Sequence, residues 1–134
     1  MKKTFPASLN ELDNVLAFAD GELDKAGCPM GTQSAINVAM EEIFVNIAHY
    51  AYTPKEGTAD VEIVIDGAAK EVSVTFTDSG VAFDPLKKQD PDTSLAAEDR
   101  KIGGLGILMV KKMMDDVAYQ RIDGKNVFTM IKKY

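Results

Sequence analysis

MEEIFVNIAHYAY, residues 40–52, places an acid, an amide and an imidazole at helical spacing within an apolar stretch. At about 100° per residue, Glu42, Asn46 and His49 fall within roughly 60° of one another on a helix. Apolar side chains cover a separate face: Ile36, Met40, Ile43, Phe44 and Ile47. One face is predicted to pack and the other to carry chemistry. Because an isolated E-x-x-x-N pair is usually an ordinary helix-stabilising pair, its meaning depends on the downstream sequence.

Length and composition predict a single domain covering residues 1–134. Hydrophobic residues make up 46% of the 134, enough for one buried core. A net charge of −6 and a pI near 4.7 argue against the basic stripe of a nucleic-acid-binding surface. The one cysteine, Cys28, excludes an internal disulfide, and no Cys/His cluster has zinc-ligand spacing. No apolar run approaches the roughly 20 residues of a membrane span, so the expected location is the cytoplasm.

Hydrophobic periodicity predicts two helices in the first half of the chain and strands after them. The first helix follows a short strand or lead-in and a capping box at Ser8-x-x-Glu11, and it stops at Gly27. The second begins at Gly31 and ends near Tyr52, because Pro54 disfavours helical backbone before it. From residue 60 the period changes to two, which indicates two strands joined around residues 66–67. Two more strands, at 117–122 and 126–131, flank an Asp-Gly pair typical of a type I′ hairpin.

Two loops interrupt this pattern. The second strand runs directly into Asp78-Ser-Gly80-Val-Ala-Phe83-Asp-Pro85, with an acid at the strand end and a glycine that permits close approach to the backbone. The polar stretch Leu86 to Lys101 is predicted to be a mobile loop. Gly103-Gly104-Leu105-Gly106 then opens a third apolar helix. Such a helix start suits a phosphate, although it matches neither a P-loop nor a dinucleotide fingerprint.

In this order, the three segments resemble the N, G1 and G2 boxes of the GHKL ATP-binding superfamily, which includes gyrase, histidine kinases and related chaperones. The similarity is strongest to its branch of anti-sigma-factor serine kinases. The boxes read Glu42-Ile-Phe-Val-Asn46 with Tyr52, the 78–85 loop quoted above, and Gly103-Gly-Leu-Gly-Ile-Leu-Met-Val110. One departure is that the histidine lies three residues after the asparagine, whereas the family's histidine commonly lies four after. His49 is therefore expected only to be a hydrogen-bonded residue at the pocket edge.

The resemblance implies a two-layer α/β sandwich of the Bergerat type. Its sheet is expected to be mixed and mainly antiparallel, with helices on one face, and the protein is expected to form a homodimer. The implied function is that of a protein serine/threonine kinase acting as an anti-sigma or partner-switching regulator. Such a kinase transfers the γ-phosphate of ATP to a serine or threonine of an anti-anti-sigma-type partner, and alternately binds a sigma factor.

Each box then has an expected role. The Asn46 amide oxygen is expected to hold Mg²⁺ together with the nucleotide phosphates and water, since Mg²⁺ often has few protein ligands. Asp78 is expected to accept a hydrogen bond from the adenine amine, which selects ATP over GTP, and Gly80 to let the base lie against the backbone. Glu42 is placed to take the proton from an attacking hydroxyl or to orient a water near the γ-phosphate. The remaining nucleotide-binding candidates are Phe83, Gly103, Gly104, Leu105 and Gly106, and the cation of a closing lid is expected among Lys87, Lys88, Arg100 and Lys101.

Two alternatives stay open at this point. One is a binding module that senses ATP or ADP and holds a partner without efficient phosphotransfer; the presence of Glu42 favours the kinase over it. The other is the catalytic domain of a sensor histidine kinase. No helical pair with a phosphoacceptor histidine fits ahead of the nucleotide boxes, which disfavours that reading.

Overall fold

The computed structural model describes residues 1–52, 55–87 and 104–134. Within these residues the strands are β1 (Lys2–Pro6), β2 (Thr58–Asp66), β3 (Glu71–Asp78), β4 (Asp116–Ile122) and β5 (Lys125–Lys133). The helices are α1 (Leu12–Lys25), α2 (Met30–Tyr50) and α3 (Gly104–Met113), with short 3₁₀ turns η1 (Leu9–Glu11) and η2 (Pro85–Lys87). The predicted helices and strands are therefore present in the predicted order.

The five strands form one sheet in the order β1-β2-β3-β5-β4. Each pairing between neighbouring strands is antiparallel, which confirms a mainly antiparallel sheet. The parallel pair that a mixed sheet would contain does not occur among the described strands. The reason is topological: β3 and β4 run in the same direction, but β5 folds back from the hairpin and lies between them.

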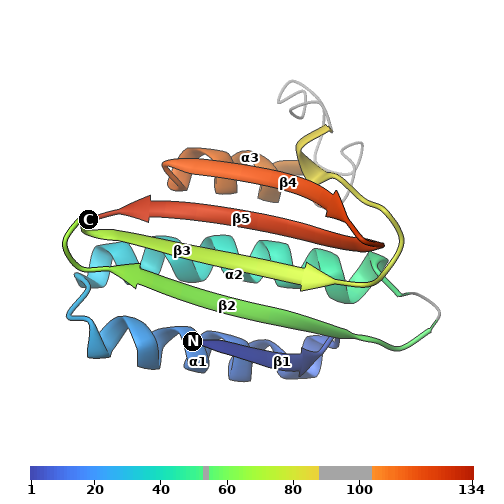
Figure 1. Ribbon diagram of the computed structural model, residues 1–134, viewed down its shortest axis with the longest axis horizontal. Helices are drawn as coiled ribbons and strands as arrows, with labels where there is room; N and C mark the ends of the chain where they lie inside the picture. Colours follow the sequence, from blue (N-terminus) through green and yellow to red (C-terminus); the bar gives the residue numbers. More distant parts are fainter. Residues whose placement is uncertain (53–54, 88–103) are drawn as a thin grey trace.

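The helices cover one face of the sheet, so the molecule has the two layers expected (Figure 1). The core lies between the layers, where alternate residues of β2, β3 and β5 point inward. The five residues of the predicted apolar face of α2 are buried: Ile36, Met40, Ile43, Phe44 and Ile47. Burial of this face fixes the rotation of α2 about its axis, and with it the direction of the polar edge.

The turn between β4 and β5 sets the register of the sheet. Asp123 and Gly124 both have positive φ, 51° and 75°, as a type I′ turn requires. This turn pairs Arg121 with Asn126, and on its other side β5 pairs Asn126 with Asp78 at the end of β3. The hairpin thus brings an amide beside the acid of the second box.

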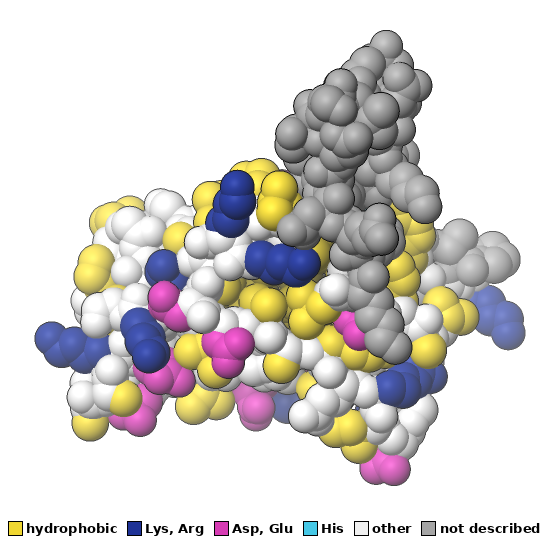
Figure 2. Space-filling model, turned by 90° about the horizontal axis from the view of Figure 1, so that it is seen from above, with side chains coloured by type: hydrophobic (Ala, Val, Ile, Leu, Met, Phe, Trp, Pro, Cys, Tyr) yellow, Lys and Arg dark blue, Asp and Glu magenta, His cyan; other side chains and the backbone are white. Residues whose placement is uncertain are grey.

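The described surface carries mixed charges. In the view onto the α3 side, lysine and arginine side chains are scattered and interleaved with acidic and apolar ones (Figure 2). The described side chains in this view therefore form no continuous basic stripe of the kind that binds nucleic acid. Of the helices in the described part of the chain, none is long and apolar enough to cross a membrane.

Candidate functional site

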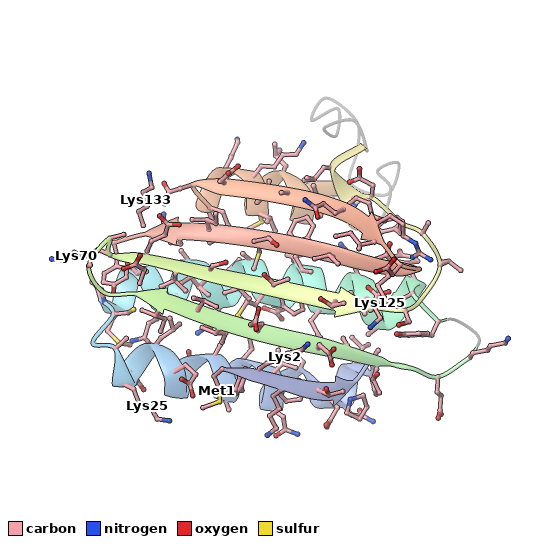
Figure 3. The ribbon with its side chains drawn as sticks, viewed as in Figure 1. Met1, Lys2, Lys25, Lys70, Lys125 and Lys133 are labelled. Carbon is pink, nitrogen blue, oxygen red and sulfur yellow. The ribbon has the colours of Figure 1, made fainter. Side chains whose placement is uncertain are left out.

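A pocket lies between the C-terminal half of α2 and the end of the sheet at which β3 terminates. Figure 3 labels Lys125 at this end of the sheet. Its described lining consists of Ile43, Asn46, Ile47, Tyr50, Ala51, Phe76, Asp78, Phe83, Pro85, Tyr119, Asn126 and Phe128. The enclosed volume is about 40 Å³, whereas small-molecule sites typically hold about 300 Å³ or more. The described walls therefore do not enclose a whole nucleotide by themselves.

Asp78 is the one acid in the described part of the pocket lining, and its side chain is held from one side. It is 5% exposed. Its Oδ1 accepts hydrogen bonds from the Gly80 amide at 2.9 Å and from Asn126 Nδ2 at 3.0 Å. No described residue donates a hydrogen bond to Oδ2. Because each carboxylate oxygen has about two acceptor positions, the described residues satisfy Oδ1 and leave Oδ2 for a donor on a ligand.

Asn126 is a central residue of the site that the sequence analysis did not identify. Its Nδ2 donates to Asp78 and to the Val81 carbonyl at 2.7 Å, and its Oδ1 accepts from the Phe83 amide at 3.2 Å and from the Tyr119 hydroxyl. The amide therefore makes all four of the hydrogen bonds available to it. The sequence does contain a signal: Asn126 is a polar residue in alternation with Phe128 and Met130, the buried apolar residues of the strand.

Aromatic rings form one wall of the pocket. Phe83, predicted to contact nucleotide, lies against Tyr50 with ring centroids 5.9 Å apart and an interplanar angle of 24°. Tyr50 occupies the position at which the resembled family commonly has histidine. Flat apolar rings at this place suit stacking against a planar base.

His49 is not at the edge of this pocket, which corrects the expectation from the sequence. It is exposed and lines a separate hollow with Pro6, the last residue of β1, and with Ala7 and Leu9 of the segment that follows. The physical reason is helical rotation. One residue turns the side chain by about 100°, so Tyr50 lines the pocket, while His49 lies beside the Tyr50 ring, with centroids 6.0 Å apart, and outside the described lining.

The structure shows why position 80 is a glycine, for a reason that could not be seen in the sequence. A Cβ atom built on Gly80 would lie 2.6 Å from the carbonyl carbon of Ala51, at the end of α2, and closer still to its oxygen. The same carbonyl accepts a hydrogen bond from the Val81 amide at 2.9 Å, and Arg121 Nη1 donates to the Gly80 carbonyl at 2.9 Å. The loop after Asp78 is thus fixed directly on the backbone of α2.

Gly80→Ala should lower the free energy of unfolding by about 1–3 kcal/mol, the usual range for an overpacked site. The obstructing atoms belong to the backbone of Ala51, which cannot rotate away as a side chain can. Gly67→Ala is the matched control, since a Cβ built there has no atom within 4 Å. Urea unfolding of both variants measures the difference. Equal stabilities of the two variants would show that the loop does not depend on this contact.

Glu42 lies one helical turn before Asn46, about 6 Å along the axis of α2. Asn46 lines the pocket, whereas Glu42 faces the first turn of α3. A Cβ atom built on Gly106 would lie 2.6 Å from Glu42 Cδ and closer still to Oε2. Partial burial raises the pKa of Glu42, and the neighbouring carboxylate of Glu41 raises it further. The structure therefore brings the predicted base against a glycine of the third box.

Several predicted residues lie outside the described part of the chain. These are Gly103, the lid candidates Lys88, Arg100 and Lys101, and most of the predicted mobile loop. Gly104 is the first residue of α3 and Leu105 the second, but the structure does not describe their side-chain surroundings, nor the side chain of Lys87. Their roles remain predictions.

Comparison with known proteins supports the family resemblance inferred from the three boxes. The sequence matches the family described as "Histidine kinase-like ATPase domain" over residues 5–132. Serine/threonine-protein kinase BtrW of Bordetella bronchiseptica is 30% identical over 95 residues, which cover 71% of this chain and 66% of BtrW. Serine-protein kinase RsbW of Listeria monocytogenes is 31% identical over 113 residues, covering 80% of this chain and 70% of RsbW.

A solved structure supports the fold. The crystal structure of the RsbU and RsbW domains of Rv1364c from Mycobacterium tuberculosis superimposes with a TM-score of 0.66 at 14% sequence identity. The superposition covers 99% of this chain and 32% of the other, so this chain spans about a third of that protein. The predicted resemblance to the GHKL superfamily and the predicted two-layer fold are both confirmed. This chain belongs to the histidine kinase-like ATPase domain family.

Proposed function

We propose that the chain is an ATP-dependent protein serine/threonine kinase that acts as an anti-sigma or partner-switching regulator. Its substrate would be a serine or threonine of an anti-anti-sigma-type protein. The observation that carries the proposal is the order of three groups along one side of the molecule. Asp78 lies at the pocket floor, Asn46 at the pocket wall, and Glu42 one turn farther along α2. A nucleotide bound by its base at Asp78 would extend its phosphates toward Asn46 and Glu42.

The base end is suited to adenine. Asp78 Oδ2 is available as an acceptor for the exocyclic amine of adenine, while guanine carries a carbonyl oxygen at the equivalent position and would meet the carboxylate with repulsion. The apolar and aromatic lining formed by Ile43, Phe83 and Phe128 suits the faces of the ring. This combination favours ATP and ADP over guanine nucleotides.

The phosphate end would be assembled by backbone and a metal ion. The Asn46 side-chain oxygen would be one ligand of Mg²⁺, and phosphate oxygens and water would be the others. The described residues contain no cluster of three or more His, Cys, Asp or Glu that would form a metal site by itself. Backbone amides of Gly103, Gly104, Leu105 and Gly106, at the start of α3, would bind phosphate oxygens. Magnesium bound here would neutralise charge that develops on the phosphates during transfer.

Glu42 would act as the general base. Its carboxylate would accept the proton from the partner hydroxyl while that oxygen attacks the γ-phosphorus; the bond from the γ-phosphorus to the bridging oxygen breaks, and ADP leaves. A carboxyl whose pKa is raised by burial holds that proton more tightly than an ordinary one, which improves it as a base near neutral pH. The names of the relatives, serine- and serine/threonine-protein kinases, support phosphate transfer to a hydroxyl as the reaction.

The proposed protein partners follow from the resemblance to the anti-sigma-factor kinases. Kinases of the anti-sigma branch that this chain resembles bind an anti-anti-sigma protein and a sigma factor in alternation, and they form homodimers. For this chain we propose the same set: an anti-anti-sigma-type substrate, a sigma factor as the competing partner, and a second copy of the chain. The nucleotide state would decide which protein partner is held.

The deciding experiment incubates the protein with γ-labelled ATP, Mg²⁺ and purified anti-anti-sigma-type proteins. We expect label on one partner hydroxyl, none on a partner whose acceptor serine is replaced by alanine, and none when Mg²⁺ is chelated. Calorimetry in parallel measures binding of ATP and of the partner. Tight nucleotide and partner binding without transfer of label would replace the kinase by the ATP/ADP-sensing binding module. Absence of nucleotide binding would contradict both.

A further inference from the structure

Gly106 and Glu42 lie so close together that a side chain at position 106 would overlap the Glu42 carboxylate. Gly106 is a buried residue in the first turns of α3. A Cβ atom at this position would lie 2.6 Å from Glu42 Cδ and 3.3 Å from Cγ, with Oε2 nearer than either. We propose that Gly106 is a positioning residue: the absence of its side chain admits the Glu42 carboxylate to the first turns of α3 and fixes it there for catalysis. This inference rests on the proposed kinase function.

The two helices leave only the Glu42 side chain free to respond. On α2, Ile43 and Phe44 next to Glu42 are buried in the core. On α3, Ile107 and Val110 are buried as well. Because both backbones are anchored on the same core, a methyl group at position 106 would be accommodated by rotation of the carboxylate, the far end of a flexible side chain. The fold would survive and the carboxylate would be displaced.

Other glycines in helices show that this contact is specific. A Cβ built on Gly21, in α1, or on Gly31, in α2, has no atom within 4 Å. Glycine is less favourable than alanine inside a helix, so its presence within α3 calls for a reason. The close approach of Glu42 supplies one that does not depend on a bound ligand.

The steric role is separable from a backbone role in phosphate binding. Gly106→Ala keeps the amide at position 106, so ATP affinity should stay within about twofold of the native value. A change of this size is what is expected when the substituted group does not interact with the ligand. The turnover number should fall by about 10-fold to 10²-fold, because a misplacement of about 1 Å costs up to that factor. A loss of affinity with native turnover would overturn the inference and assign Gly106 to the phosphates.

A double-mutant cycle identifies the partner of Gly106. If the glycine acts through Glu42, adding Gly106→Ala to the Glu42→Ala variant should change turnover by no more than about twofold. Gly21→Ala is the control for a glycine-to-alanine change in a helix, and it should leave turnover at the native value. An equal loss from Gly106→Ala in the native and the Glu42→Ala backgrounds would show that it acts independently of Glu42. If the single variant does not fold, the inference requires the double variant to fold, since it lacks the clash.

The last readout does not need kinase activity. Titration of the ¹³C-labelled Glu42 carboxyl by NMR should give a lower pKa in Gly106→Ala than in the native protein, because displacement exposes the group to water and weakens the effect of burial. If the native protein transfers no phosphate, the proposed function fails and this titration alone decides the inference. An unchanged Glu42 pKa in a folded Gly106→Ala variant would overturn it.

Discussion

Glu42→Ala should lower phosphate transfer by about 10² to 10⁴, the range expected when a general base is removed, while ATP and partner binding remain. The carboxylate lies against the first turns of α3 and is not part of the pocket lining, so its loss removes no contact to the base. Single-turnover transfer of label and calorimetric titration with ATP separate the two effects. Transfer at the native rate in this variant would exclude Glu42 as the base.

The pH dependence gives the same variant a second signature. Transfer by the native protein should decline as the pH falls through the pKa of Glu42, since a protonated carboxyl cannot accept the hydroxyl proton. Burial and the charge of Glu41 raise that pKa, so the decline should begin at a higher pH than for an ordinary glutamate. The acidic limb should disappear in Glu42→Ala.

Glu41→Ala is the matched control for the loss of a carboxylate on α2. Glu41 is exposed, and removing its charge should leave transfer largely intact while moving the acidic limb to lower pH, because one cause of the raised Glu42 pKa is removed. An acidic limb that persists unchanged in Glu42→Ala would assign it to another group.

Asp78→Asn should weaken ATP and ADP by about 10-fold to 150-fold, which corresponds to about 1.5–3 kcal/mol for a hydrogen bond to a charged group. The amide oxygen can keep both protein bonds of Oδ1, to Gly80 and Asn126. The amide nitrogen would then take the place of Oδ2 and present a donor to the donor of the adenine amine. The two nucleotides should weaken equally, because they share the base.

Asp66→Asn is the control for this exchange. The Asp66 carboxylate caps the amides of Ala68 and Ala69 in the β2–β3 turn at 3.0 Å each, and it contributes nothing to the pocket lining. Its replacement should leave nucleotide affinity at the native value. Calorimetry showing the same affinity for Asp78→Asn as for the native protein would remove Asp78 from the adenine site.

The elements of this fold follow from local patterns. The period of two in β2 and β3, the apolar face of α2 and the Asp-Gly turn before β5 each depend on residues within a few positions of one another. These patterns predicted the order of the elements and the side of α2 that packs. The three boxes, quoted by residue, were sufficient to predict the family.

The hydrogen bonds and contacts that assemble the site could not be predicted in this way, because they join residues far apart in the chain. Asn126 bonds to Asp78 across 48 positions, and the register that allows it depends on β5 lying next to β3. The position of His49 shows the same limit at short range: the burial of the neighbouring apolar face fixes the helix rotation, and that rotation places Tyr50 in the described pocket lining and His49 outside it.

The sequence by itself determined which groups are available: an acid and an amide one turn apart on α2, an acid at the end of β3, and glycines at the start of α3. How these groups are used depends on which elements pack together. Gly80 contacts Ala51, and Gly106 contacts Glu42, at places where two elements lie so close together that a Cβ atom on the glycine would overlap its neighbour. A glycine in the sequence indicates that another group can approach the backbone closely at that position. Which group does so depends on how the whole core packs.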